Sequence, residues 1–159
     1  MTRNQELAIE HFRKLIGVVE GPSEWLVIDQ ERIDAFADAT LDHQFIHVDP
    51  ERARATPFGG TIAHGFLTLS LLPHLHLSIP RGEPAALNGL AMAINYGLDR
   101  VRFPAAVPVG RRLRATRELL TVEPLGPQWV QTCERITIEL EGSDRPACVA
   151  ELLTRWSYP

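Results

Sequence analysis

Apolar side chains recur at helical spacing near the start of the chain. Phe12, Leu15 and Ile16 share one stripe of residues 4–16, and charged residues occupy the opposite face. This pattern predicts an amphipathic helix that ends at Gly17, because glycine commonly follows the last turn of a helix.

A short strand and a second helix are expected next. Residues 25–28 are apolar and follow a Gly-Pro-Ser turn, which predicts a strand. Asp29 can cap a helix whose buried stripe includes Phe36. This helix is expected to end near Thr40, which leaves residues 42–47 in a loop.

The segment over residues 62–77 is apolar on nearly every side. Such a pattern predicts a helix that is buried all round, rather than one that lies on a surface. A short helix that starts at Asp49-Pro50 and a Pro/Gly-rich loop at residues 56–60 are expected before it. Pro73 falls inside the apolar segment and should bend the helix or end its regular part.

The second half of the chain has the patterns of strands. Residues 90–98 are almost wholly apolar, as in a strand covered on both faces, and residues 97–104 suggest a bent or bulged edge strand. Residues 111–122, 128–141 and 147–156 complete the set, and polar and apolar positions alternate in the last two. We expect these last strands to pair in sequence as an antiparallel meander.

This order of elements predicts an α+β fold. Helices come first, then one nearly all-apolar helix, then four or five strands. An antiparallel sheet wrapped around a single buried helix satisfies that order, and this is the hotdog architecture. A chain of 159 residues, 45% of them apolar, is long enough to bury a core, so we expect residues 1–159 to form one domain.

Composition narrows the classes of function. A net charge of −4 argues against a nucleic-acid partner, because no general positive field attracts phosphate. No apolar run reaches the roughly 18 to 20 residues of a membrane span, and the first residues lack the apolar stretch of a signal peptide. Cys133 and Cys148 have no metal-type spacing, which favours a cytoplasmic protein with reduced thiols.

Asp42 and His47 are the first candidates for chemistry. In a loop, side chains five residues apart can converge on one small molecule. Imidazole gives and takes protons near pH 7, and a neighbouring carboxylate can orient it or share a water with it. The alternative is that Asp42 caps a turn while His47 lies on the surface, and the spacing alone does not decide between these readings.

The start of the apolar segment offers hydrogen-bond donors. Gly60 precedes it in a Gly-Gly pair, and Ala63-His64-Gly65 occupies the expected first turn, where backbone N–H groups have no intrahelical partner. Such an N–H can hold a carbonyl oxygen on which negative charge develops. Alternatively, Gly65 serves close packing and His64 is bonded to backbone.

Arginines are concentrated in the second half of the chain. Arg102, Arg112 and Arg114 could meet the phosphates of a large substrate handle, although a solvated sheet face is an open alternative. His74 and His76 are two residues apart, so they point in different directions on a helix, and no third ligand is evident. We therefore expect no metal site.

Two linked motifs resemble the MaoC-like dehydratase family. They are F-A-D-A-T-L-D-H-Q-F-I-H-V-D-P-E-R-A at residues 36–53 and G-G-T-I-A-H-G-F-L-T-L-S-L-L at residues 59–72. The family includes (R)-specific enoyl-CoA hydratases and a branch named after nodulation protein N. The resemblance is strong over residues 24–72 and continues through residues 95–104.

The resemblance implies a function and roles for particular residues. The family's catalytic aspartate and histidine fall on Asp42 and His47, and its helix-start glycine falls on Gly65, with His64 and Gly60 beside it at the substrate. The implied reaction is (R)-specific hydration of a trans-2-enoyl-CoA thioester to (R)-3-hydroxyacyl-CoA. It implies no metal or redox cofactor, CoA present only as part of the substrate, and a homodimer.

This chain departs from the hydratase pattern at several positions. Leu41 stands where glycine is usual, Gln44-Phe45 replaces Asn-Pro, and Pro73 aligns with a serine of some hydratases. Two alternatives to the hydratase therefore remain. One is a hotdog thioesterase in which Asp42 activates water toward the thioester carbonyl, and the other is a subunit that binds acyl thioesters without catalysis.

Overall fold

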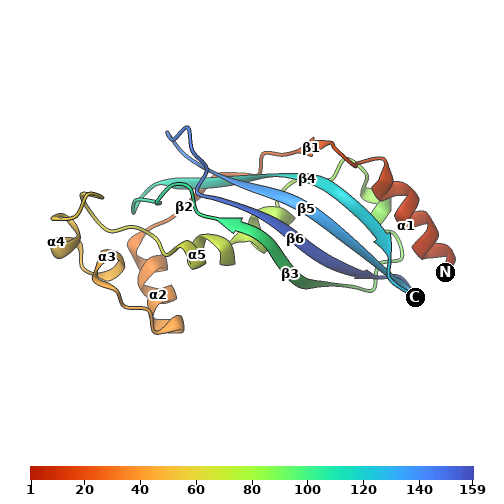
Figure 1. The fold of residues 1–159 in the computed structure, drawn as a ribbon, viewed down its shortest axis with the longest axis horizontal. Helices are drawn as coiled ribbons and strands as arrows, with labels where there is room; N and C mark the ends of the chain where they lie inside the picture. The colour runs from red at the N-terminus through yellow and green to blue at the C-terminus, as the bar shows by residue number, and fades with distance from the viewer.

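The structure, a computed structural model, describes all 159 residues as one curved antiparallel sheet with helices against it (Figure 1). The six strands follow the order β1-β4-β5-β6-β3, and β2 also pairs with β4. Their bounds are β1 Val19–Glu20, β2 Leu26–Val27, β3 Met92–Arg102, β4 Arg112–Pro124, β5 Trp129–Leu140 and β6 Cys148–Ser157.

The last three strands confirm the predicted meander. β4 pairs with β5 from Leu113 opposite Leu140, and β5 pairs with β6 from Trp129 opposite Ser157. Buried and less buried residues alternate along all three strands, so one face of each strand lies toward the helices. The alternation of polar and apolar residues in the sequence therefore matches the alternation of exposed and buried side chains in these strands.

β3 is the far edge of the sheet, and it differs from the prediction in one respect. The irregularities in its pairing with β6, between Asn95 and Gly97 and between Asp99 and Arg102, confirm the expected bulges. The expectation that residues 90–98 are covered on both faces is wrong, since Met92, Ile94 and the residues after them are mostly exposed. The physical reason is that β3 contributes no buried residue to either core, and a groove lies between it and the α5–α6 helices.

The helices are short. They are α1 Arg3–Arg13, α2 Gln30–Thr40, α3 Phe45–Val48, α4 Pro50–Ala53, α5 Gly65–Ser70, α6 Leu72–Leu77 and the 3-10 helix η1 Pro84–Leu87. Asp29 caps α2 and Asp49 caps α4, as predicted. The loop predicted for residues 42–47 is partly wrong, because a single helical turn, α3, carries His47. No helix combines the length and apolar character required to cross a membrane.

The predicted central helix is broken into α5 and α6. Pro73 lies in the first turn of α6, where its missing N–H and fixed φ fit a new helix better than the interior of a continuous one. The expectation of burial on all sides is also wrong for this chain, because Phe66 is 67% exposed and Leu77 is 79% exposed. The sheet covers one side of the helix pair, and in a single chain the opposite side faces solvent.

Two hydrophobic cores lie between the helices and the sheet. The larger packs Leu67, Leu72 and Leu75 of the helix pair against the inner residues of β4, β5 and β6. The smaller packs α1 against the other end of the sheet. The predicted α+β hotdog architecture is thus confirmed, with a sheet wrapped on a central helical element.

A buried charged cluster lies between the two cores. It consists of Glu20, His76, Arg81, Arg117 and Glu134. On β4, Arg117 falls between Ala115 of the larger core and Leu119 of the smaller one. Charged groups in this position are stable only when they are paired and hydrogen-bonded.

Candidate active site

The turn after α2 positions Asp42. Leu41 caps α2 in the left-handed conformation with φ 63°, which reverses the chain and is uncommon for a residue with a branched side chain. Glycine adopts this conformation without steric cost, which accounts for the glycine that the hydratase pattern has at the position of Leu41. The Asp42 side chain is exposed, and its carboxylate accepts only a long hydrogen bond of 3.4 Å from the Gln44 N–H.

His47 lies on α3 and is buried. Its Nδ1 lies 2.7 Å from the carbonyl oxygen of Ile62. A carbonyl oxygen can only accept, so Nδ1 carries a proton and donates it. In the neutral ring the lone pair is therefore on Nε2, which is left free to accept a proton.

His64 is the N-cap residue of α5 and is also buried. Its Nε2 lies 2.9 Å from the backbone oxygen of Asp42, so Nε2 carries the proton of the neutral ring. The ring stacks on His47 with centroids 3.8 Å apart and an angle of 25° between the planes. Phe36 packs against His64 with a centroid separation of 5.0 Å.

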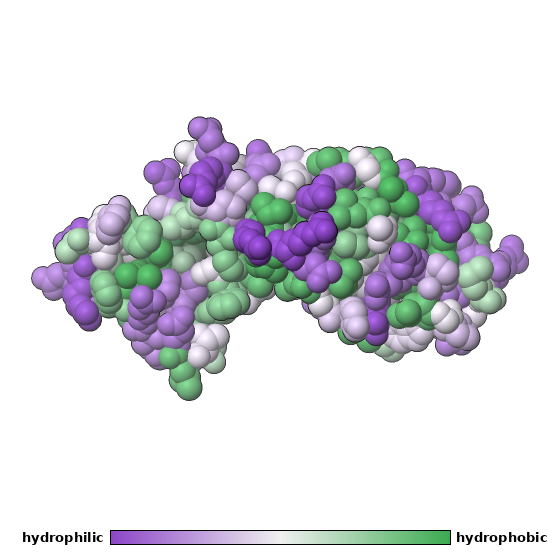
Figure 2. Space-filling view, viewed as in Figure 1, coloured by the Kyte–Doolittle hydropathy of each residue, from purple (hydrophilic) through white to green (hydrophobic).

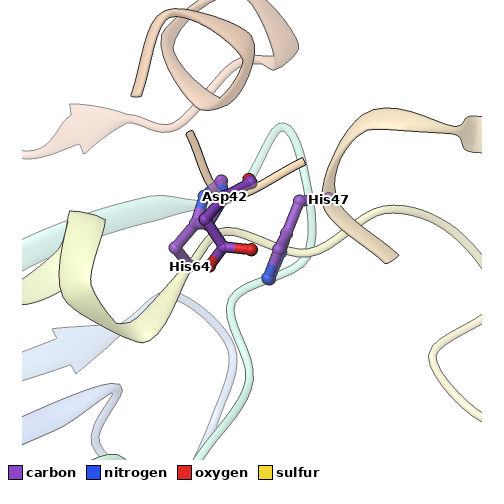
Figure 3. Close-up of side chains that lie close together, drawn as sticks. All are labelled: Asp42, His47 and His64. Atoms are coloured by element: carbon purple, nitrogen blue, oxygen red, sulfur yellow. The ribbon is translucent and has the colours of Figure 1, made fainter. Parts of the chain in front are cut away.

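The fold brings the three polar groups together. One ring nitrogen from each histidine and one carboxylate oxygen of Asp42 all lie within 4.8 Å of one another. Figure 3 shows the Asp42 carboxylate directed toward the His47 ring. Because a bound ion lies near the plane of each imidazole that holds it, two stacked and nearly parallel rings are poorly placed to share one metal.

The surroundings of His47 lower its pKa from the ordinary value of 6.5. Burial is the largest cause, since it disfavours the charged ring, and the neighbouring His64 acts in the same direction. The hydrogen bond to Ile62 and the charge of Asp42 oppose this shift without cancelling it. The ring is therefore neutral at pH 7 and can act as a base.

A pocket of about 260 Å³ opens beside His47. It is mainly apolar, and its walls include Gly65, Thr68 and Phe103. As the first residue of α5, Gly65 has an N–H with no acceptor inside the helix. A Cβ at Gly65 would lie 3.1 Å from the Phe103 ring, so a larger residue here would fit only if the ring moved by a few tenths of an ångström.

The other predicted site residues lie elsewhere. Gly60 is not among the residues that line the pocket. Arg112 and Arg114 lie on the outer face of β4, where they are paired with Glu141 and Glu139. They alternate with buried Leu113 and Ala115, so they point away from the helices.

Arg102 is exposed near the end of β3. Its guanidinium donates to the backbone oxygen of Val101. Phe45, one of the departures from the hydratase pattern, packs under the guanidinium of Arg52, 4.4 Å from its ring centroid, and does not line the pocket. Pro73 lies away from this pocket, in a groove between the helix pair and β3.

Thr68 and Phe103 are pocket residues that the sequence did not single out. Phe103 follows β3 and meets α5 across the pocket, with its ring 6.1 Å from that of Phe66. It belongs to residues 95–104, which carry the weaker part of the family resemblance. That stretch was the available signal, but contact with Gly65 depends on the folded chain.

Comparisons with known proteins agree on one family. The family model described as "MaoC like domain" matches residues 12–135. The chain is 57% identical over 136 residues to 3-hydroxyacyl-thioester dehydratase Z of Mycobacterium tuberculosis, which covers 86% of this chain and 87% of the relative. It is 48% identical over 150 residues to nodulation protein N of Rhizobium leguminosarum bv. viciae, with 94% and 91% covered.

A solved structure shows the same fold. The MaoC-like dehydratase from Rhodospirillum rubrum superposes with a TM-score of 0.72 at 20% sequence identity, covering 91% of this chain and 93% of that one.

Proposed function

The chain belongs to the MaoC-like domain family and is an enzyme of the hydratase/dehydratase type, and on this basis we propose that it hydrates trans-2-enoyl-CoA thioesters to (R)-3-hydroxyacyl-CoA, reversibly. The observation that carries the proposal is the approach of the Asp42 carboxylate to His47, within 4.8 Å, beside a mainly apolar pocket. The name of the Mycobacterium tuberculosis relative, a 3-hydroxyacyl-thioester dehydratase, supports the same class of substrate.

The reaction needs a base, a proton donor and a site for negative charge. Water lies between Asp42 and Nε2 of His47, and this pair removes one proton as the water oxygen bonds to C3. The electron pair of the C2–C3 double bond moves toward the thioester, and its oxygen is stabilised by the Gly65 N–H. Asp42 and His47 then return this proton to C2 on the same face of the former double bond, so water is added syn and the acid/base pair regains its starting protonation state.

No cofactor takes part in this proposal, and CoA enters only as the handle of the substrate. Arg102 directly precedes the pocket residue Phe103 in the sequence, and its guanidinium bonds only to the backbone oxygen of Val101, so it can meet a CoA phosphate. Arg112 and Arg114 can do so only by giving up their bonds to Glu141 and Glu139. We therefore give Arg102 the larger role among the three.

Variants of the acid/base pair test the proposal. With crotonyl-CoA as substrate, Asp42→Asn and His47→Gln should each lower kcat by about 100-fold or more, since positioned general acid–base groups contribute about 10²- to 10⁴-fold. Asp38→Asn and His43→Gln are matched controls, because these residues form an exposed pair next to the site and should leave kcat unchanged. Wild-type rates in both site variants, with circular dichroism showing intact folding, would refute the assignment.

The same assay separates the two alternative functions. Hydration removes the enoyl absorbance and retains the thioester, whereas a thioesterase releases free CoA, which a thiol reagent detects. A protein that only binds acyl thioesters produces neither signal. Release of CoA at the rate of enoyl loss would replace the hydratase with the thioesterase.

We also propose that two copies of the chain pair through β3. This strand has a free edge of eleven residues, and its apolar side chains Met92, Ile94 and Tyr96 are exposed in the single chain. Figure 2 shows apolar surface among charged side chains across the strands. A long exposed edge with apolar side chains readily pairs with another strand.

Sedimentation measurements test this assembly. The wild-type protein should sediment as a dimer, and Ile94→Lys should shift it toward the monomer because the charge is placed on the pairing edge. Val19→Lys is the control, since Val19 is an exposed apolar residue of β1, at the opposite edge of the sheet. A monomeric wild-type protein at micromolar concentration would rule the dimer out.

A further inference from the structure

His64 makes contacts that its place at a helix start does not require. Its Nε2–H reaches back 22 residues to the backbone oxygen of Asp42. Apart from this bond, Asp42 makes only the long contact with its neighbour Gln44. His64 is therefore the one residue outside the loop that holds Asp42 by a hydrogen bond.

The same ring also defines the position of His47. One face of His64 stacks on the His47 ring, and Phe36 of α2 packs against it as well. His47 is held at its edge by the Ile62 carbonyl, so the stack supplies a second, independent constraint. The two constraints together fix the plane of the His47 ring and the direction in which its Nε2 points.

His64 is adjacent in sequence to Gly65, which lines the pocket. A single residue thus contacts Asp42 and His47 and is covalently joined to Gly65. Its Nδ1 is buried and has no hydrogen-bond partner. A histidine kept only for structure would be expected to satisfy both nitrogens, so this feature favours a functional reason for the imidazole.

We infer that His64 is a positioning residue of the proposed hydratase, which holds Asp42, His47 and the Gly65 N–H in one arrangement. This inference rests on the proposed function. The titratable groups that face His47 are Asp42 and His64, and the rest of the pocket wall is uncharged.

Two substitutions separate the two contacts. His64→Phe keeps a ring between Phe36 and His47 but has no donor for the Asp42 oxygen. His64→Gln keeps an N–H donor of similar reach but removes the stacked ring. Neither changes a residue placed in the acid/base pair.

The loss of the Asp42 bond should lower kcat in His64→Phe by about 10- to 100-fold with little change in KM, since a small misplacement of a catalytic group costs that much. His64→Gln should retain more of kcat, but the acid limb of its kcat/KM profile should move to higher pH, because a neighbour that lowers the pKa of His47 is gone. A purely structural role would lower the melting temperature without moving this limb.

Titration of ¹⁵N-labelled histidines provides a readout that does not depend on turnover. It should show His64 as the Nε2–H tautomer and a higher pKa for His47 in His64→Gln, even if His64→Phe fails to fold. Unchanged kcat and pH profile in both folded variants, with an active wild type, would overturn this inference alone. An inactive wild type would instead overturn the proposed function, and the inference with it.

Discussion

Arg117 is the residue whose replacement should affect stability most. It is 1% exposed, and its Nε lies 2.9 Å from a carboxylate oxygen of Glu20. Its other two nitrogens donate to the backbone oxygens of His76 and Pro80, at the end of α6 and just beyond it. Arg117→Met keeps much of the side-chain volume but removes the charge and all three hydrogen bonds.

The stability lost in Arg117→Met depends mainly on the buried carboxylate that is left without a partner. Removing one partner of a buried ion pair costs about 3–5 kcal/mol, because the other charge is left uncompensated. For a domain of about this length, each kcal/mol shifts Tm by about 2–4 °C, so Tm should fall by about 6–20 °C. The total stability of a domain is about 5–15 kcal/mol, so this loss is a large part of it, and circular dichroism at 25 °C should first establish that the variant is folded.

Thermal unfolding followed by circular dichroism at pH 7 measures this effect. Arg112→Met is the matched control, since this arginine lies on the same strand but its pair with Glu141 is exposed, and its Tm should hardly move. Arg117→Met combined with Glu20→Gln should lose less than the sum of the single changes, because the pair is then removed together. A Tm for Arg117→Met equal to that of Arg112→Met would refute the reasoning.

Two further predictions concern pH and the pocket. Burial raises the pKa of Glu134, but the hydrogen bond with His76 and two nearby guanidinium groups outweigh burial and leave the pKa below its ordinary value of 4.5. The carboxylate therefore stabilises the fold above pH 4.5 and loses this contribution as the pH falls below it, so Tm should drop in acid and Glu134→Gln should flatten the profile. Gly65→Ala should reduce kcat/KM about 10-fold or more by pressing a methyl group against Phe103 and disturbing the N–H donor, and Phe103→Leu should restore part of the loss.

The sheet was predictable because strand alternation is local. Residues 128–141 carry their burial pattern in their own sequence, and β5 follows it. The same alternation also indicates that Arg117 is buried. Along β4 it falls on the face of buried Leu113 and Ala115 and not on the face of Arg112. The alternation along one strand can identify a buried arginine, but its partners Glu20 and Glu134 lie on other strands, and only the fold brings them together.

The central helix and the site were predictable only in part. Apolar composition at residues 62–77 predicts burial without saying what covers each side, so exposed Phe66 was unforeseen. The motifs pointed to Asp42 and His47 through family resemblance, since a spacing of five residues constrains little. The bond from His64 to the Asp42 oxygen joins residues 22 apart, and no periodic pattern encodes it.

The two helices of the broken central element are anchored at opposite ends by different chemistry. At the start of α5, His64 bonds to Asp42 in the site, and at the end of α6, the His76 carbonyl accepts from Arg117. The junction at Leu71 and Pro73 lies between these anchors, so disturbance at one end need not be transmitted to the other as it would through one straight helix. Arg117→Met should accordingly lower Tm while leaving kcat at 25 °C near the wild-type value, whereas His64→Phe should lower kcat with a much smaller effect on Tm.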